Sequence, residues 1–277
     1  MLNLKAKIAV AAAVFAAAAL PILGTAAPAS AAVTGDTSTD WAGYFATTSA
    51  PIDAAGVSFT VPKGANCGES RGTPNVNGYQ ALMWVGIGGF NGAYGIKSGP
   101  LFQDGVEAYC AKLSNSTPVY LPWWEVYPGT PSVMTFTSTA RISAGARITA
   151  QVYAPGEFSA AEKGEWTFVV TAAYPGHATT WTTHYKAPSS AKDYTAEVVT
   201  EREPHVPGFV DVGKVTYSSA DYFTDNMDSL HSIVVTPVTL VNKGAAVVVP
   251  SSPSKDPDDG LKDSFSTSYA VNWLAPS

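Results

Sequence analysis

The sequence predicts an all-β protein, and three observations favour an antiparallel β-sandwich or barrel. Short runs of β-branched and aromatic residues recur along the chain, several of them alternating with polar residues at the strand period of two. Turn residues separate these runs at short intervals. No stretch keeps a helical period of 3.6 residues for more than two turns. Because no internal repeat and no linker interrupts the pattern, we expect a single domain over residues 32–277.

The first 31 residues have the pattern of a secretory signal peptide. Lys5 and Lys7 give a positive start, residues 8–23 are apolar, and residues 29–31 (ASA) form a small-residue cleavage site. The alternative is a membrane anchor, but Pro21 interrupts the apolar run and the cleavage site follows at once. No later run approaches the roughly 20 apolar residues that a spanning helix needs. We therefore expect a secreted protein that does not associate with a membrane once the signal is removed.

The charge of the remaining chain excludes some partners. Without Lys5 and Lys7, residues 32–277 carry a net charge close to −8. An acidic chain with no basic patch is a poor binder of nucleic acid. Only 14% of the whole chain is charged, and Ser, Thr and Gly supply the polar surface. Such a surface changes charge little as pH falls, which suits an acidic setting. We expect a monomer.

In the first part of the domain, strand-like runs alternate with loops. Residues 41–47 (WAGYFAT) and 56–61 (GVSFTV) are short β-type runs. Residues 62–77 are rich in Gly, Pro and Asn, which predicts a loop. Residues 81–87 (ALMWVGI) form an apolar run of strand length, and residues 88–99 are Gly-rich, which predicts a second loop.

Later strands follow the same pattern. In residues 147–153, Ile148, Ala150 and Val152 alternate with polar or aromatic residues, as expected of a strand with one wet face. Residues 250–262 are rich in Pro, Ser and Asp, which predicts a loop. We expect further strands at residues 133–140, 165–172, 179–185, 193–201, 214–218, 231–240 and 265–274.

Residues 120–128 (YLPWWEVYP) hold the densest aromatic cluster of the chain. Aromatic residues suit a half-buried pleated surface, so one interpretation is a core strand. The other is the wall of a cleft that carries the carboxylate of Glu125. The stretch alone leaves both open.

Cys67 and Cys110 are the only cysteines. In an exported protein the default is one disulfide, and two free thiols are the alternative. The disulfide would close a loop of about 44 residues, which contributes on the order of 3–4 kcal/mol in the chain-entropy model. Two cysteines with no nearby histidine make a poor metal site.

The usual catalytic signatures are missing. No G-x-S-x-G elbow, H-E-x-x-H helix or phosphate loop occurs, and two S-x-x-K matches, at residues 189–192 and 252–255, lie in loop-like composition. The histidines share no ligand spacing; they are His177, His184, His205 and His231. We expect no metal and no cofactor.

Carboxylates remain as candidates. Glu125 lies in the aromatic stretch and Glu107 in the run FQDGVEAYC. Glu197 and Glu201 are four residues apart on an expected strand, so both would point to one face together with Val199. Such a pair is commonly a solvated edge, but it can also line a cleft where one acid is a general base.

The chain resembles the glutamic peptidases, or eqolisins, along nearly all of residues 32–277. Six blocks carry the resemblance, and they occur in the family's order. They are DWAGY at 40–44 (family N-W-[AG]-G-Y), MWVGIGG at 83–89 (W-V-G-I-D-G), FQDGVEAYC at 102–110 (E-Q-x-G-T-E-A-x-C), PWWEVYP at 122–128 (W-Y-E-x-Y-P), AEVVTE at 196–201 (A-E-[WF]-I-x-E) and DVGKVTY at 211–217 (D-F-G-x-V-x-F).

The resemblance implies a concanavalin A-like sandwich of two antiparallel sheets, one curved into a concave substrate cleft. It implies a secreted acid endopeptidase that acts on polypeptides, with Gln103 and Glu201 as the catalytic pair and no metal or covalent intermediate. A carboxylate is still partly ionised near pH 4, where a histidine is protonated and useless as a base. Supporting residues would be Trp41, Trp84, Glu107, Trp123, Trp124, Glu125 and Glu197.

Some positions depart from the family. Gly88 stands where the motif has Asp, which removes an expected carboxylate, and Val106 and Val198 replace Thr and an aromatic residue. The long connection before Gln103 also permits a rival register in which Lys97 takes its place. A second class of function, a carbohydrate-binding or glycan-hydrolysing sandwich, would also suit an aromatic groove lined with acids.

Overall fold

In a computed structural model, the chain is described at residues 36–38, 40–48, 51–72, 79–89, 99–111, 117–129, 131–134, 141–159, 164–187, 193–201, 208–223, 234–242, 245–250, 254–255 and 264–273. The predicted signal peptide, residues 1–31, lies outside these ranges. None of the described segments forms a helix that is long and apolar enough to cross a membrane.

The described elements are all strands. They are β1 (Asp36–Ser38), β2 (Trp41–Thr47), β3 (Ala54–Thr60), β4 (Asn66–Gly72), β5 (Tyr79–Ile87), β6 (Leu101–Cys110), β7 (Val119–Tyr127), β8 (Ser132–Val133), β9 (Arg147–Tyr153), β10 (Trp166–Tyr174), β11 (His177–Tyr185), β12 (Thr195–Glu201), β13 (Gly208–Asp211), β14 (Lys214–Phe223), β15 (Val234–Asn242), β16 (Ala245–Pro250), β17 (Ser254–Lys255) and β18 (Ser264–Trp273).

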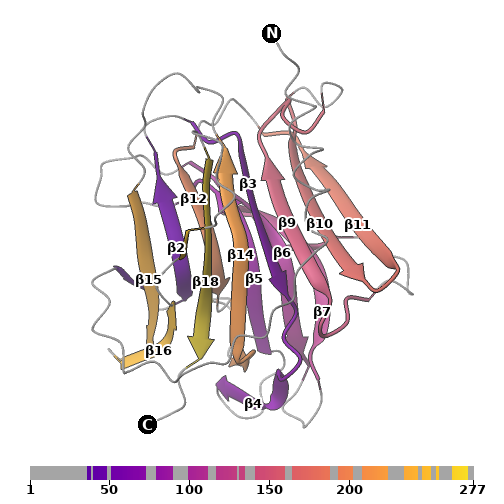
Figure 1. Cartoon of the computed structure of the whole chain (residues 1–277), viewed down its shortest axis with the longest axis vertical. Helices are drawn as coiled ribbons and strands as arrows, with labels where there is room; N and C mark the ends of the chain where they lie inside the picture. Colours follow the sequence, from indigo (N-terminus) through magenta and orange to yellow (C-terminus); the bar gives the residue numbers. More distant parts are fainter. Residues whose placement is uncertain are drawn as a thin grey trace. The chain divides into compact units, whose positions relative to one another are not determined.

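The strand pairings define two sheets, which confirms the predicted sandwich. The first, here called the site sheet, has the order β15-β2-β12-β5-β6-β7. The second, the back sheet, has the order β11-β10-β9-β3-β14-β18. Its strands lie side by side across the front of Figure 1. Strand β16 pairs with both β15 and β18 and so joins the sheets at one edge. Among the described strands, only β1 with β15 and β13 with β5 pair in parallel.

The main hydrophobic core lies between the two sheets. Every second residue of β5 and β6 in the site sheet packs against alternate residues of β3, β9 and β10 in the back sheet. Phe102 of β6 stacks on Trp166 of β10 with ring centroids 3.7 Å apart. This packing fixes which face of β6 is turned away from the core, and Gln103 lies on that other face.

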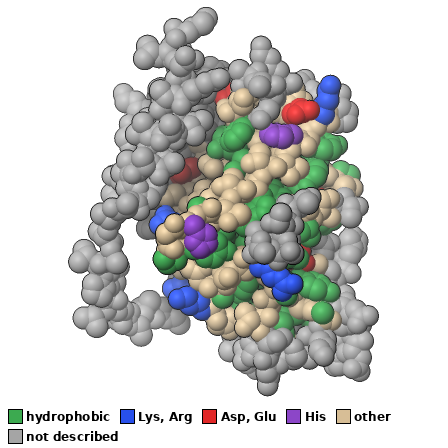
Figure 2. All heavy atoms as spheres, turned by 90° about the vertical axis from the view of Figure 1, so that its right-hand side faces the viewer, with side chains coloured by type: hydrophobic (Ala, Val, Ile, Leu, Met, Phe, Trp, Pro, Cys, Tyr) green, Lys and Arg blue, Asp and Glu red, His purple; other side chains and the backbone are tan. Residues whose placement is uncertain are grey.

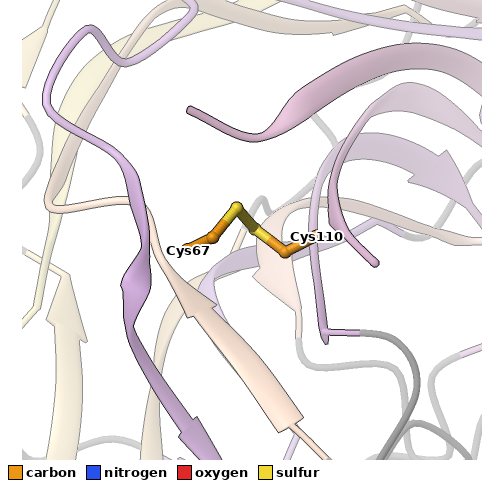
Figure 3. Close-up of a disulfide and its surroundings, with 2 residues drawn as sticks. All are labelled: Cys67 and Cys110. Carbon is orange, nitrogen blue, oxygen red and sulfur yellow. A yellow bond between two sulfur atoms is a disulfide. The ribbon is translucent and has the colours of Figure 1, made fainter. Parts of the chain in front are cut away.

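The predicted disulfide is confirmed and joins β4 to β6. Cys67 and Cys110 are bonded, as Figure 3 shows, and both are buried. Strand β4 falls within residues 62–77, so the prediction of a loop there is wrong for Asn66–Gly72. Its composition gives no strand signal, and pairing with β13 together with the bond to β6 holds it in place.

The outer edge of the back sheet is polar but carries little charge. Strand β11 exposes Thr180, Thr182 and His184 to solvent. Figure 2, which views the molecule from this side, shows mostly uncharged polar and apolar groups over the described surface, with few acidic or basic side chains. This agrees with the low charge density of the sequence.

Candidate functional site

The central strands of the site sheet turn one side of each strand away from the core. On β6, Phe102 and Val106 enter the core, so Gln103 and Glu107 point the other way. We call this surface the acid face. Its members are Trp41, Leu82, Trp84, Gly86, Leu101, Gln103, Gly105, Glu107, Trp123, Glu125, Glu197, Val199 and Glu201. Every predicted site residue except Trp124 belongs to it.

Trp124, which is expected to be a supporting residue, lies on the opposite face of β7 from Trp123 and Glu125. It packs against the core, with its ring 5.1 Å from that of Phe168 and 6.0 Å from that of Tyr185. Neighbours in a strand point to opposite faces, so Trp123 and Glu125 cannot share a face with Trp124.

Gln103 and Glu125 form a hydrogen-bonded pair across β6 and β7. The two residues are direct partners in the register, and Gln103 Nε2 donates to Glu125 Oε2 at 2.8 Å. Both side chains are buried. The amide oxygen, Gln103 Oε1, is also buried and has no hydrogen-bond partner. The hydrogen bond at its nitrogen therefore fixes the amide, and its oxygen remains available to accept a hydrogen bond.

Two tryptophans hold Glu201. Trp41 Nε1 donates to Oε1 at 2.9 Å, and Trp84 Nε1 donates to Oε2 at 2.7 Å. The two indoles meet edge to face with centroids 5.3 Å apart. Because an indole N–H can only donate, this arrangement presents two donors to a carboxylate and fixes both of its oxygens.

Trp84 also connects the neighbourhoods of Glu201 and Gln103. It lies on β5, the strand between β12 and β6. A Cβ added to Gly86 would lie 2.9 Å from Trp84 Cζ3 and 3.3 Å from Gln103 Cβ. One end of the indole therefore bonds to Glu201, and its other edge reaches the space beside Gln103. Any side chain at position 86 would collide with Trp84 and with Leu101, whose Cδ1 would lie 2.8 Å from the added Cβ.

The remaining predicted residues line the same face. Gln80 Nε2 donates to Glu107 Oε1 at 2.6 Å. Trp123 is buried opposite Gly105, and its indole nitrogen has no partner. Glu197, Val199 and Glu201 share the face, as their spacing predicts.

Two buried acids of this region have raised pKa values. Glu197 is fully buried, and desolvation raises its pKa well above the ordinary value; the Thr195 hydroxyl lowers it in part, and the charge of Asp193 raises it further. Desolvation also raises the pKa of Asp193 to about 7. Both groups keep their protons at the pH where ordinary carboxyls ionise.

Asp104 is a third buried acid, and sequence reasoning missed it. It follows Gln103 but faces the core, where Oδ2 accepts a hydrogen bond from the Val169 backbone N–H at 2.7 Å. Desolvation raises its pKa well above the ordinary value, although the Val169 and Gln151 N–H groups lower it. Strand alternation alone places Asp104 on the same face as Phe102 and Val106, which is the signal that could have found it.

The other sequence candidates do not join the acid face. His177 and His184 lie on β11, at the far edge of the back sheet. Lys97, the rival to Gln103, and residues 189–192, His205 and His231 lie outside the described residues. No group of three or more His, Cys, Asp or Glu side chains in the described ranges is arranged to hold a metal ion.

Comparisons with known proteins give a family match and a fold match. The model of the peptidase A4 family matches residues 39–256. No curated protein is significantly similar.

Solved structures of two other proteins are similar in fold. A structure of scytalido-glutamic peptidase with a transition state analog inhibitor has a TM-score of 0.55 at 15% identity, over 85% of this chain and 98% of that one. A second structure of that peptidase, with a peptide-based transition state analog, gives 0.54 at 15% identity over the same shares. SCP-B, described as a member of the eqolisin family and bound to the tripeptide Ala-Ile-His, gives 0.51 at 14% identity, again over 85% of this chain and 98% of that chain.

Proposed function

Because the chain belongs to the peptidase A4 family, a family of glutamic-type endopeptidases, we propose that it is secreted and cleaves polypeptides at acid pH with Gln103 and Glu201 as its catalytic pair. The observation that carries the proposal is the fixing of both side chains on one face. Glu201 is held by two indole donors and Gln103 by Glu125. Preorganised polar groups of this kind lower the barrier of a hydrolytic step.

In the proposed reaction, Glu201 is the base and then the acid. Its carboxylate takes a proton from a water molecule whose oxygen attacks the scissile carbonyl carbon. The carbon–nitrogen bond then breaks as Glu201 returns the proton to the leaving nitrogen. The products are a carboxylic acid and an amine, and no covalent intermediate forms.

Gln103 stabilises the charge that develops. Its amide nitrogen carries two N–H groups, one of which is bound to Glu125. The second can donate to the oxyanion of the tetrahedral intermediate. The buried and unpartnered Oε1 can hold the attacking water. Glu125 is thus a supporting residue that orients the amide.

The acid face favours operation at low pH. Its carboxyls are Glu107, Glu125, Glu197 and Glu201, with Asp193 beside them, and no Lys or Arg among the described side chains lies on it. Burial raises the pKa values of Glu197 and Asp193, so these two groups are neutral at low pH and add no negative charge there.

A cleavage assay tests the proposal. Denatured casein and β-glucan are incubated at pH 3.5 with wild type, Glu201→Gln and Gln103→Ala. We expect wild type to cut casein only. Loss of the base lowers kcat by about 10²–10⁴-fold, and loss of the amide donor by about 10²–10³-fold.

Glu165→Gln, at the residue just before β10 of the back sheet, is the matched control and should keep wild-type activity. Circular dichroism establishes that each variant is folded. Undiminished casein cleavage by Glu201→Gln, or cleavage of β-glucan in place of casein, contradicts the proposal.

Export is tested separately. A disulfide of this kind persists in oxidising compartments, which supports secretion. Amino-terminal sequencing of protein from the culture medium should begin at Ala32. A cell-bound protein that keeps residues 1–31 contradicts this part of the proposal.

A further inference from the structure

A short chain of hydrogen bonds crosses the core directly behind Glu201. Tyr217 of β14, in the back sheet, donates its hydroxyl to the Val199 carbonyl oxygen of β12 at 3.0 Å. The same hydroxyl oxygen lies 2.7 Å from Thr200 Oγ1. Because a hydroxyl carries a single hydrogen, the Thr200 hydroxyl is the donor in this second bond. One tyrosine of the back sheet therefore holds the two residues that come before Glu201 in β12.

Both hydroxyls of this bridge are shielded from water. Tyr217 is fully buried and Thr200 is 1% exposed. Burial raises the pKa of Tyr217, although the bond from Thr200 lowers it in part, so the phenol keeps its proton at acid and neutral pH. In the interior such a hydrogen bond is stronger than at the surface, and a hydroxyl that loses its partner there destabilises the fold.

An irregularity in β14 turns Tyr217 toward the core. Val215, Tyr217, Ala220 and Tyr222 all belong to the core, so the alternation of inward and outward residues shifts by one between positions 217 and 220. The register of β14 with both β3 and β18 breaks at the same place, in the manner of a β-bulge. Ser219, inside the break, has a φ of +50°, which is unfavourable for a residue with a side chain. In a regular strand that buries Ala220 and Tyr222, Tyr217 would point away from β12.

The end of β12 is held from both faces of the site sheet. Glu201 is the last residue of the strand. On the acid face, its carboxylate accepts hydrogen bonds from Trp41 and Trp84, which belong to the two strands that flank β12. On the core face, Tyr217 holds the residues just before it. A catalytic group that is misplaced by about 1 Å can lower the rate on the order of 10²-fold, so this double attachment bears on catalysis.

On the premise of the proposed function, we propose that Tyr217 and Thr200 are positioning residues: their hydroxyl bridge holds the end of β12 where the Glu201 carboxylate lies between the two indoles. Both residues act through Glu201 from the core side of the sheet. The bridge is not implied by the family motif, since D-F-G-x-V-x-F has Phe at the position of Tyr217.

A pair of variants separates positioning from stability. Tyr217→Phe removes the partner of the Thr200 hydroxyl, so the urea midpoint of unfolding should fall. In the double variant Tyr217→Phe/Thr200→Val both hydroxyls are replaced by apolar groups of similar shape, so the midpoint should return close to that of wild type. The bridge is absent from both proteins, and we expect both to cleave denatured casein at pH 3.5 with kcat about 10-fold lower, as a displacement below 1 Å would cause. KM should stay within about twofold of wild type.

Tyr120→Phe is the matched control. Tyr120 is also buried, and its hydroxyl donates to the Pro62 carbonyl oxygen at 2.8 Å. It lies near the start of β7, and neither of its neighbours in the chain is a proposed catalytic residue. This variant should lower the urea midpoint and leave kcat unchanged.

The outcomes distinguish the bridge from the proposed function. A double variant with the kcat of wild type, or an equal fall of kcat in Tyr120→Phe, overturns the positioning role, while casein cleavage by wild type still supports the peptidase. If Tyr217→Phe fails to fold, the double variant decides, because it leaves neither hydroxyl of the bridge unpaired. A wild type that cuts casein at no pH overturns both proposals.

Discussion

Gly88 adopts a φ of +89°, with the Pro100 carbonyl oxygen 2.5 Å from where a Cβ would be. The Asp193 carboxyl crowds the same position. Only glycine adopts such a backbone at little cost, and here it also meets the space requirement. The local backbone and packing therefore require glycine at position 88, where the W-V-G-I-D-G motif has Asp.

We expect Gly88→Asp, which restores the motif, to destabilise the protein. A positive φ costs about 1–3 kcal/mol for a residue with a side chain, and the contact with the Pro100 backbone adds to this cost. Urea unfolding at pH 4 measures the loss of free energy, and casein cleavage should fall.

The comparison of Gly88→Ala with Gly213→Ala separates the two causes. Gly213 has a φ of +69° and nothing within 4 Å of its Cβ position, so it shows the backbone cost alone. Equal losses of unfolding free energy at both positions would rule out crowding at position 88 as a cause of the loss.

At the residue scale, the sequence predicted the residues that lie in family motifs. It missed residues whose surroundings come from distant parts of the chain. Gln103, Glu125 and Glu201 were found because the blocks around them match a family. The Asp193 carboxyl lies against Gly88 and Gly99, which are about a hundred residues earlier in the chain, and no periodicity encodes such a contact.

At the scale of elements, the disulfide ties the least regular strand to the strand that carries Gln103. It joins β4 to the last residue of β6, over a sequence separation of 43. The catalytic candidate lies near the other end of β6. The bond should therefore matter more for stability than for chemistry.

We expect the double variant Cys67→Ala/Cys110→Ala to lose about 3–4 kcal/mol of unfolding free energy, from the entropy that the closed loop removes from the unfolded chain. Its kcat at 15 °C should stay within about threefold of wild type. Urea denaturation and casein cleavage provide the two measurements. A fully stable double variant would show that β4 needs only its pairing with β13.

Strand prediction succeeded where packing on one face dictates the sequence. Residues 41–47 and 147–153 coincide with β2 and β9, whose buried positions are set by the core between the sheets. Strand β4 has the sequence NCGESRG, in which no alternation can be seen. Its pairing with β13 and its disulfide are contacts with distant parts of the chain, so local propensity could not predict it.

At the scale of the whole molecule, buried acids set the pH dependence of stability. The pKa values of Asp104, Asp193 and Glu197 are all raised by desolvation in the folded state. Below about pH 4 these groups are protonated in both the folded and the unfolded protein, so they do not lower the free energy of unfolding. As pH rises, the unfolded chain releases protons that the folded protein retains, so stability falls. For Asp193 the loss builds up between about pH 4 and about pH 7.

We expect Tm to be highest near pH 3–4 and to fall steadily toward pH 8. Differential scanning calorimetry at constant ionic strength measures it. Asp104→Asn should flatten the slope, because an amide cannot ionise. A Tm that rises between pH 4 and pH 7 would contradict the assignment of these acids as protonated in the folded protein.

The two indole hydrogen bonds to Glu201 also make tryptophan fluorescence a probe of the acid face. Tryptophan emission responds to charge near the ring, and the N–H groups of Trp41 and Trp84 both end on this carboxylate. Any event that neutralises, moves or covers Glu201 therefore perturbs two fluorophores at once. The protein carries its own optical reporter of the state of its proposed base, and occupancy of the site can be followed without a label.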